Sequence, residues 1–585
     1  MKATLIFDSV NNLLFSKWDD SFIQRMKSFH EQDNEYIADS HNVAQLLSPI
    51  ITSQRVMAAQ FGNSYSSMQC KDNTTIVFDE WLDHVFMIIS EDSVDEAHRE
   101  LMDCKTLVQH ICGQNINLLQ SPAYQNWLSV LLDSRTKGDS IPGASGVIGE
   151  SGASAAALSA LKAAAKDIKT APYQHYHLML VVGDKILALY SSRGSEDLLP
   201  PDLIMLSVQC IAAQEYWQDA KHSSGDGQNE VVLLPWLREN SGVVQLTSGA
   251  ARAPSAPHEL RLAALAPRLT LLVLRDLELR EIGVSTYMST QILSNLRRLL
   301  LQRNLELLPS TLDALEASLK KTTDALRKNK ANAPLCARVS SRMLELRKSC
   351  TTTTPLTPET AATAMHTALE AVIELLKPEV APTNLTQAVK DLKTALAPYV
   401  DFLQVKAMRY FSLGSSEPDV SSLTLHKYVE EFPGLVHFVY VDRAAARSLA
   451  PDMADCKDML APDTVKQIVN RSLSIVREGY SAATWRRGAL HVACVWWWTR
   501  RGVALRPAAP HPAAVRALPP AGDLAGTFYR QLTELSFPND SAGVSLKELI
   551  CIHLGLLPAS SALQQARRLA HSVLELGDHG AHDLL

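Results

Sequence analysis

A short stretch rich in glycine and serine has residue types that could bind phosphate or carry out nucleophilic catalysis. Gly143, Gly146, Gly149 and Gly152 recur at every third position. A phosphate-binding loop also needs a lysine and must follow a strand, whereas this stretch lacks the lysine and follows an expected helix. Nor does it complete the Gly-x-Ser-x-Gly turn of a nucleophilic serine. We therefore interpret residues 134–153 as a flexible linker, with a nucleotide-binding enzyme or hydrolase as an alternative.

His491 and Cys494 are types that bind metals, and they stand three positions apart. The surrounding apolar run, Ala489–Thr499, predicts a strand, on which this spacing places side chains on opposite faces. We expect both residues to belong to a core. The nine cysteines are scattered without a C-x-x-C pair, a pattern typical of reduced cysteines in the cytosol.

Trp496, Trp497 and Trp498 are flanked by two arginine pairs, Arg486-Arg487 and Arg500-Arg501. Aromatic rings beside cations are the chemistry of nucleic-acid or anionic-lipid binding. The alternative is a hairpin with a basic turn, whose tryptophans alternate between the core and a neighbouring domain. The formal net charge of −6 favours the hairpin. Lipid binding stays open as the other interpretation.

Length and composition limit the number of domains and the kinds of partner that this chain can have. The 585 residues predict three to five domains, since single cores seldom exceed about 250–300 residues. The acidic balance argues against a nucleic-acid partner. No apolar run approaches the roughly 20 residues of a membrane-spanning helix, and the N-terminus reaches Asp8 too early for a secretory signal. We expect a cytosolic protein whose membrane association is peripheral.

The elements that must position these residues follow three similar passes along the chain. The first pass begins with hairpins, the second of which turns around residues 79–81, and continues with helices, one capped by Ser93 with Glu96 three residues later. Pro49 should bend the first helix or mark its start. The expected strands are Thr4–Phe7, Leu13–Lys17, Thr75–Phe78 and His84–Ile89, and the expected helices are His41–Phe61, Ser93–Cys112 and Tyr124–Leu132.

The second pass and the region after it are predicted from the same periodicities. The expected helices are Ser154–Ile168, Pro201–Trp217 and Ser285–Arg303, and the expected strands are Tyr176–Val182, Lys185–Ser191, Val231–Leu234, Leu260–Leu265 and Leu269–Leu274. Residues 305–410 favour three or four helices, interrupted at prolines.

The third pass starts near Leu423 and contains a Pro/Ala-rich loop at residues 506–522. Its expected strands are Val436–Asp442, Ala489–Thr499 and Val503–Arg506, and its expected helices are Thr464–Glu478, Leu524–Leu535, Ser545–Leu556 and Ser560–Leu576. Small antiparallel sheets flanked by helices make an α+β fold. The predicted divisions are 1–135, a linker and Ala-rich helix at 136–172, 173–304, a helical region at 305–415, and 416–585.

The segment Glu431–Arg443 is the most distinctive stretch in the sequence. Phe432-Pro433-Gly434 predicts a turn, because Pro fixes one backbone angle and Gly permits the next. The following apolar run predicts a buried strand ending in Asp442-Arg443, with His437 as a core histidine. The residues concerned are Phe432, Pro433, Gly434, Leu435, Val436, His437, Phe438, Tyr440, Asp442 and Arg443.

This segment resembles the same stretch in the triple longin family of the Hermansky–Pudlak syndrome 1, Mon and Fuzzy proteins. Further stretches are similar in the same order along the chain: Leu47–Ile51, Leu187–Ser192, Pro201–Leu203, Asp401–Lys406, Glu478–Tyr480 and Gln564–Arg568. The resemblance implies three longin domains with a helical insert.

The resemblance also implies a function that needs no catalytic side chain and no cofactor. It implies a heterodimer with a Hermansky–Pudlak syndrome 4 protein homologue, called the biogenesis of lysosome-related organelles complex three. This complex would act as a guanine-nucleotide exchange factor for Rab GTPases of the thirty-two and thirty-eight subfamily at melanosomes and similar organelles. Leu47, Pro49, Ile50 and Ile51 in the first domain are the candidate Rab-facing residues. A Rab effector or tethering subunit of the same fold is the alternative.

Overall fold

A computed structural model describes the chain except residues 28–39, 62–64, 137–140, 148–150, 168–174, 224–233, 235–241, 249–252, 352–356, 377–383, 412–431, 452–459 and 582–585. The predicted strand at 231–234 lies almost entirely outside the described residues, as does the predicted start of the third pass at Leu423. The chain forms two compact units, each built from separated segments. Unit 1 comprises residues 1–129, 235–259 and 276–381, and unit 2 comprises residues 130–234, 260–275 and 382–585.

Unit 1 begins with a five-stranded antiparallel sheet. Its strands are β1 (Lys2–Phe7), β2 (Leu13–Trp18), β3 (Ser67–Gln69), β4 (Thr75–Trp81) and β5 (His84–Ser90), in the order β2-β1-β5-β4-β3. Both predicted hairpins are confirmed. The second one turns at Leu82-Asp83, which have φ angles of 49° and 64°, and not at residues 79–81. Asp79 and Glu80 resemble turn residues in the sequence, but they belong to the end of strand β4.

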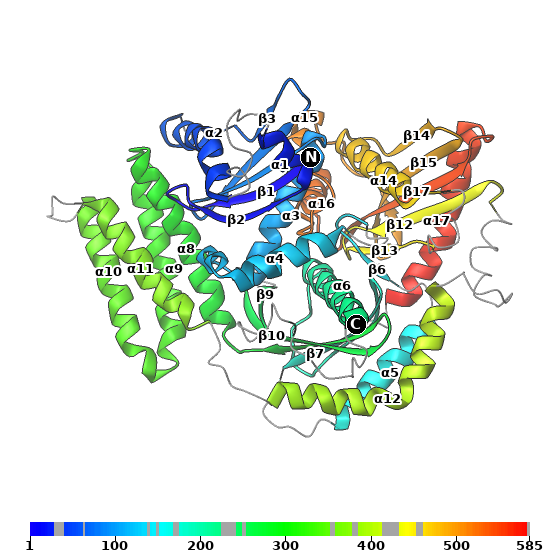
Figure 1. Ribbon diagram of the computed structural model, residues 1–585, viewed down its shortest axis with the longest axis horizontal. Coiled ribbons are helices and arrows are strands. Elements are labelled where there is room, and N and C mark those ends of the chain that lie inside the picture. Colours follow the sequence, from blue (N-terminus) through cyan, green and yellow to red (C-terminus); the bar gives the residue numbers. More distant parts are fainter. Residues whose placement is uncertain are drawn as a thin grey trace. The chain divides into compact units, whose positions relative to one another are not determined.

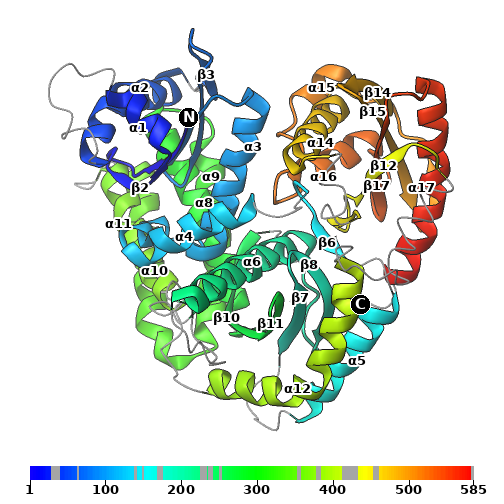
Figure 2. The same cartoon turned by 45° about the vertical axis from the view of Figure 1, so that its right-hand side comes forward.

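Helices cover both faces of this sheet (Figure 2). Helices α1 (Asp20–Lys27) and α2 (Ser40–Phe61) pack on one face through a cluster that includes Phe22, Val43 and Ile51. Helix α3 (Val94–Cys112) packs on the other face. Its predicted cap is confirmed, because the Ser93 side chain accepts from the Glu96 N–H and the Glu96 carboxylate accepts from the Ser93 N–H. The short helix η2 (Ile116–Gln120) and α4 (Pro122–Arg135) follow.

A helical bundle makes up the rest of unit 1, together with β9 (Val243–Ser248) and the first half of β10 (Ala253–Ala266). Its helices are α8 (Arg280–Leu301), α9 (Leu308–Arg327), α10 (Ala333–Thr351) and α11 (Pro358–Glu374), with the short turn η3 (Lys330–Asn332) between α9 and α10 (Figure 1). Leucines such as Leu293, Leu315 and Leu346 fill their shared core. The predicted helices of residues 305–410 are therefore present, but the last one, α12 (Asn384–Phe411), belongs to unit 2.

Unit 2 contains a long mixed sheet whose strands follow the order β14-β15-β17-β12-β13-β6-β8-β7-β11. Strands β7 (Tyr176–Val182), β8 (Lys185–Ser191) and β11 (Leu269–Asp276) form its middle-sequence part, next to the second half of β10. Helices α5 (Ser151–Asp167) and α12 pack on this part through a core that includes Leu161, Leu180 and Leu392. Helix α6 (Pro200–Ser223) contacts it through Gln214, whose side-chain amide donates to Thr270 Oγ1 at 3.1 Å.

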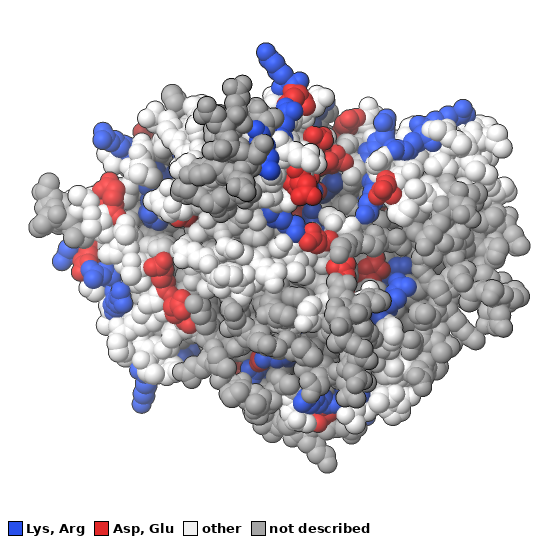
Figure 3. Space-filling model, in the orientation of Figure 1, with Lys and Arg blue, Asp and Glu red and all other residues white. Residues whose placement is uncertain are grey.

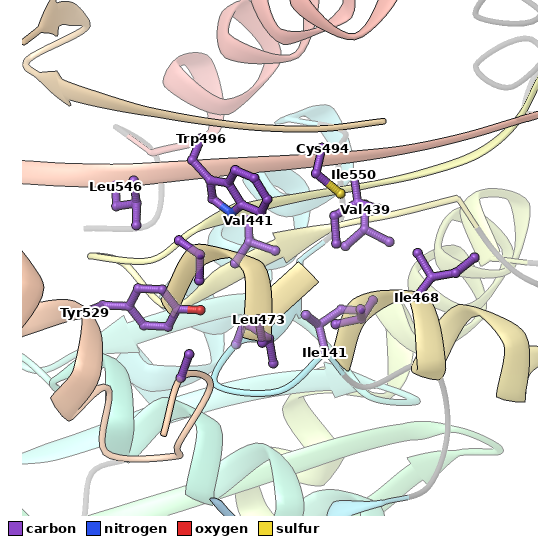
Figure 4. Packing of buried hydrophobic residues seen from close by; sticks show 14 of the residues in the cluster. Ile141, Val439, Val441, Ile468, Leu473, Cys494, Trp496, Tyr529, Leu546 and Ile550 are labelled. Carbon is purple, nitrogen blue, oxygen red and sulfur yellow. The ribbon is translucent and has the colours of Figure 1, made fainter. Parts of the chain in front are cut away.

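The C-terminal part of unit 2 supplies the antiparallel end of the same sheet. Its strands are β12 (Leu435–Asp442), β13 (Arg447–Leu449), β14 (Ala482–Arg487), β15 (Leu490–Arg500), β16 (Val503–Leu505) and β17 (Val544–Leu554). Helices α14 (Pro462–Arg477), α15 (Pro512–Arg516) and α16 (Thr527–Ser536) lie on one face over a large apolar cluster, part of which Figure 4 shows. Helix α17 (Ala559–Ala581) covers the other face over a second cluster.

Three predictions for unit 2 are wrong in an informative way. The predicted helix at 545–556 is strand β17, which pairs with β12 on one side and β15 on the other. The supposed linker at 134–153 contains β6 (Ser145–Val147), which pairs in parallel with β13 and β8. The supposed loop at 506–522 contains the short helix α15. For β17 and β6, distant strands determine the structure, and local composition does not reveal them; α15 begins at a local cap formed by His511 and Pro512.

Gly283 in α8 tests the packing of unit 1. A Cβ atom at this position would lie 1.9 Å from the backbone oxygen of Ser255, which cannot move away as a side-chain end could. We predict that Gly283→Ala lowers the free energy of unfolding by about 1–3 kcal/mol, as overpacking does, measured by urea denaturation. Met288→Ala, at a partly exposed position on the same helix, is the control and should change stability by less than about 0.5 kcal/mol. An unchanged midpoint for Gly283→Ala would contradict this packing.

Candidate functional site

A buried ion pair lies where the distinctive segment ends. The Arg443 and Glu548 side chains are both 0% exposed, and Arg443 Nε donates to Glu548 Oε2 at 2.9 Å. Arg443 Nη1 also donates to the Pro142 carbonyl oxygen at 2.7 Å, and the guanidinium lies 4.5 Å from the centre of the Tyr529 ring. Ser472 Oγ donates to the second carboxylate oxygen at 2.5 Å. One pair thus joins β12, β17, α14, α16 and the segment that leads into β6.

The neighbouring residues form a second charged pair. The Asp442 carboxylate accepts from Lys547 Nζ and from Ser545 Oγ, the latter at 2.6 Å, and it caps the following turn through the N–H groups of Ala444 and Ala445. Burial raises the pKa of Asp442, but Lys547 and these hydrogen bonds outweigh it, so the net pKa is lowered. For Arg443 burial lowers the pKa, but Glu548 outweighs it and the net pKa is raised. Both groups are therefore held in their charged forms.

The rest of the segment forms a turn followed by a buried strand. Leu435 N–H donates to the Phe432 carbonyl at 3.0 Å, and Gly434 has a φ of 82°, so Pro433-Gly434 form the centre of a tight turn. From Leu435 to Val441 every residue is buried, and these side chains divide between the clusters on the two faces of the sheet. His437 is one of the buried residues, and burial together with nearby Lys185 lowers its pKa to about 4.

The candidate metal and lipid residues are built into this same layer. His491 and Cys494 lie on opposite faces of β15, as expected, with His491 Nδ1 2.9 Å from the Leu557 carbonyl and Cys494 in the core near Glu548. Among the described residues, no group of three or more His, Cys, Asp or Glu could hold a metal ion. Burial and Glu548 raise the pKa of the Cys494 thiol, which keeps it protonated.

The three consecutive tryptophans pack inside the C-terminal part of unit 2. Trp496 and Trp498 point into the cluster beneath α14 and α16, and Trp497 packs with Tyr440 on the α17 face at a ring distance of 6.2 Å (Figure 4 shows Trp496). The alternation that was predicted is present, but the second face is covered by α17 of the same domain. The lipid interpretation of exposed tryptophans is therefore wrong. Within the described part of the chain, no helix is long and apolar enough to cross a bilayer.

The glycine repeat provides room for backbone packing. Gly143 has a φ of 66°, and a Cβ there would lie 3.0 Å from the Asp523 carbonyl oxygen. A Cβ on Gly146 would lie 2.8 Å from Cγ of Lys185. Gly149 lies outside the described residues. Residues 143–147 are thus packed against neighbouring backbone and strands, an arrangement unlike an open loop that cradles phosphates.

Helix α2 presents an uncharged outer face in unit 1. Leu47 and Ile51, two of the candidate Rab-facing residues, are buried in the core beneath the helix, whereas Pro49 is exposed and Ile50 is half-buried. Continuing along the same face are Thr52, Ser53 and Val56, the last 41% exposed. Val10, in the β1–β2 turn, is 72% exposed. We call Val10, Pro49, Thr52, Ser53 and Val56 the α2 surface.

Short polar contacts hold this surface in place. Arg55 donates to the carbonyl oxygens of Asp8 and Asp83, and Asn11 Nδ2 donates to Thr52 Oγ1 at 3.4 Å. Asp8 in turn orders the β1–β2 turn by accepting from the N–H groups of Val10 and Asn12. Helix α2 is therefore anchored to two hairpin turns of its own sheet. The sequence signal for the α2 surface was the near absence of charge between residues 42 and 61, where Arg55 is the one charged side chain.

Sequence reasoning missed the partners of Arg443. Residues 545–556 were predicted to be a helix, so Glu548 was not recognised as the partner of Arg443, nor Lys547 as the partner of Asp442. The pairing Asp442↔Lys547 and Val441↔Glu548 sets these charges beside each other.

Breaking the buried pair should strongly destabilise the C-terminal part of unit 2. We predict that Arg443→Met costs about 3–5 kcal/mol in the free energy of unfolding, because it leaves the Glu548 carboxylate buried without a counter-ion. The double variant Arg443→Met/Glu548→Leu removes both charges and should be more stable than Arg443→Met alone. Urea denaturation followed by tryptophan fluorescence measures both, and a double variant no more stable than Arg443→Met would contradict a coupled pair.

His437 should make stability depend on pH. Its folded pKa is about 4, below the ordinary value of 6.5, so between these values the unfolded chain binds a proton that the folded chain does not. Stability should therefore fall as the pH drops from about 6.5 towards 4. We predict that His437→Leu reduces the slope of the free energy of unfolding against pH by at most the amount that one bound proton contributes. Urea denaturation at a series of pH values measures this slope. His571→Leu, at an exposed histidine of α17, should leave the slope unchanged; equal slopes for all three proteins would contradict the prediction.

Two models of known protein families match the two ends of the chain, and the limits of each match follow the helices and strands described above. The model described as the first longin domain of FUZ, MON1 and HPS1 matches residues 2–133, which hold the five-stranded sheet with α1 to α4. The model described as the third longin domain of FUZ, MON1 and HPS1 matches residues 434–576, from the turn before β12 into α17. Residues 2–133 and 434–576 are therefore longin domains, similar to the first and third longin domains of FUZ, MON1 and HPS1.

Proposed function

We propose that this chain is one subunit of a heterodimeric guanine-nucleotide exchange factor for a Rab GTPase. The match of residues 2–133 and 434–576 to longin domains of FUZ, MON1 and HPS1 is the observation that carries the proposal. In its specific form, the partner is a Hermansky–Pudlak syndrome 4 protein homologue and the GTPase belongs to the thirty-two and thirty-eight subfamily. The complex then serves lysosome-related organelles such as melanosomes, to which it is recruited peripherally from the cytoplasm.

The α2 surface is the part of the first domain that best suits a GTPase contact. Interface centres between proteins are depleted in charged residues, and the α2 surface combines two exposed valines with a proline and two hydroxyls. Arg55 points its guanidinium to backbone carbonyls below the helix. The helix therefore offers a preformed, uncharged face whose anchoring reduces the ordering that binding requires.

Exchange by such a surface requires differential binding and no chemical step. A protein that binds the nucleotide-free GTPase more tightly than the loaded form lowers the affinity for nucleotide by the same factor. Shifting the switch segments of the GTPase is sufficient for this. The role of this chain's residues is then to bind and orient the GTPase, and the proposal includes no catalytic side chain and no cofactor.

Release of fluorescent GDP from the Rab protein tests the proposal. We expect the co-purified heterodimer to accelerate release well above the intrinsic rate, and this chain alone to do so far less. Val56→Asp with Val10→Asp places two charges on the α2 surface and should reduce the rate about tenfold or more, since buried unpaired charge is costly at an interface. Val503→Asp, at a valine that is 65% exposed in unit 2, is the matched control and should retain the rate.

Two results would separate this proposal from its rival. A complex that binds the GTP-loaded Rab in pull-downs and leaves GDP release unchanged is an effector or tether, and the exchange proposal is then wrong. If the Val56→Asp/Val10→Asp complex accelerates GDP release as much as the unmodified complex, the exchange function stands, but the α2 surface is not the contact with the GTPase.

A further inference from the structure

Strand β14 forms an open end of the sheet in unit 2. It pairs with β15 along its whole length, from Ala482↔Val495 to Arg487↔Leu490, and β15 pairs with β17 on its other side. In the part of the chain that the structure describes, no strand lies on the outer side of β14. Such an edge presents backbone donors and acceptors that a further strand can use.

The outward backbone groups of β14 can be identified from the ladder. Trp496 N–H donates to the Ser481 carbonyl at 2.9 Å, so Ser481 faces β15. Because hydrogen-bonding positions alternate in an antiparallel pair, Ala483, Trp485 and Arg487 also face β15. The N–H and C=O groups of Ala482, Thr484 and Arg486 then point away from the sheet.

Three arginines, Arg471, Arg486 and Arg487, lie at this edge. Residues 461–516 hold nine Lys and Arg but two acids, Asp463 and Glu478, in a chain whose net charge is −6. Arg486 and Arg487 are exposed on opposite faces of β14. Arg471 of α14 lies over the Trp485 ring, and Arg487 Nη2 donates to the neutral Gln467 side chain. Figure 3 shows Lys and Arg gathered at the upper right, where Figure 1 labels β14 and α14.

These observations favour an extended polypeptide over a membrane. The tryptophans that could insert into a bilayer are taken up by the core of the domain, as described above. A strand edge contributes directional main-chain hydrogen bonds, which a polypeptide uses and a lipid surface does not. The surrounding arginines supply charge complementarity to acids on either face of an added strand.

We propose that the β14 edge binds an extended acidic segment of a partner protein as an additional strand. The main chain of that segment would pair with Ala482, Thr484 and Arg486, and its Asp or Glu side chains would lie beside Arg471 and Arg487 on the α14 face or beside Arg486 on the other. This site is separate from the α2 surface in unit 1, and it stands whether or not the chain takes part in nucleotide exchange.

A labelled peptide tests the proposal on the full-length chain. The probe is a fluorescein-labelled decapeptide of alternating Val and Glu, followed by fluorescence anisotropy, and the comparison peptide has Lys in place of Glu. We expect the Glu peptide to bind, its affinity to fall with rising salt, and the Lys peptide not to bind. Equal binding of both peptides would overturn the charge requirement.

Two variants address charge and backbone separately. Arg486→Glu/Arg487→Glu should weaken binding of the Glu peptide about tenfold, and Lys320→Glu/Lys321→Glu, an exposed basic pair on α9, should leave it unchanged. Thr484→Pro removes one outward N–H but no bond to β15, and should weaken binding about three- to tenfold. Thr484→Ala keeps that N–H and should bind normally. Thermal melts of the four variants check that each one is folded.

The alternative occupant is an outcome of the same experiment. Vesicles with 30% phosphatidylserine are tested with the unmodified chain and with the same variants. If the unmodified chain and Thr484→Pro bind these vesicles equally and Arg486→Glu/Arg487→Glu does not, the basic edge is a lipid contact and the strand proposal is wrong. Failure of the Glu peptide to bind the unmodified chain would also overturn it. Neither result bears on GDP release, which depends on unit 1.

Discussion

The C-terminal longin domain depends on charge neutralisation inside an apolar sheet. Glu548 and Lys547 sit on its central strand, β17, with β12 on one side and β15 on the other. A carboxylate removed from water is tolerated when a cation and further donors surround it, and Arg443 with Ser472 provide these. Because Arg443 also holds the Pro142 carbonyl, the same neutralisation fixes the chain that enters β6. The distinctive segment at 432–443 thus determines how strands, helices and an upstream segment meet.

In unit 1 the main feature is an uncharged helix, α2, which is held at the surface with its outer side exposed. The inner side of α2 supplies Val43, Leu47 and Ile51 to the core, and its outer side remains uncharged. Arg55 uses its charge on backbone carbonyls of two turns, so the helix is positioned without placing a charge on its outer face. Arg55 contacts the backbone carbonyl of Asp83, and the carboxylate of the same residue pairs with Arg297 of α8 at 2.6 Å, which fixes the bundle to this turn.

Local interactions made part of this architecture predictable. The hairpins, the Ser93 cap, the Pro433-Gly434 turn and the α+β class follow from residues within a few positions of each other, and all of them are present. Helix α2 does not start at Pro49, which was one of the two expectations for this residue; it continues through the proline, because residues on both sides of it pack in the same core and offset the lost hydrogen bond.

Elements stabilised by distant partners could not be predicted in this way. Leu546, Leu549 and Ile550 fit a helical period, and Lys547 and Glu548 resemble its polar side; the strand forms because β12 and β15 neutralise and bury it. Similarly, Leu47 and Pro49 are close in sequence, and only the sheet beneath them decides which one is buried. The resemblance to a family supplied the functional hypothesis, and the positions of charged and uncharged surfaces came from the structure.

Strand β6 has a consequence for how the chain is synthesised. Its neighbours in the sheet are β8, which begins at residue 185, and β13, which begins at residue 447. During translation β6 therefore leaves the ribosome roughly 300 residues before one of its two partners exists, and unit 2 stays incomplete while much of unit 1 is already made. Such long-range closure is slow and exposes unpaired strand edges, so the nascent chain is expected to depend on chaperones until its last strands emerge.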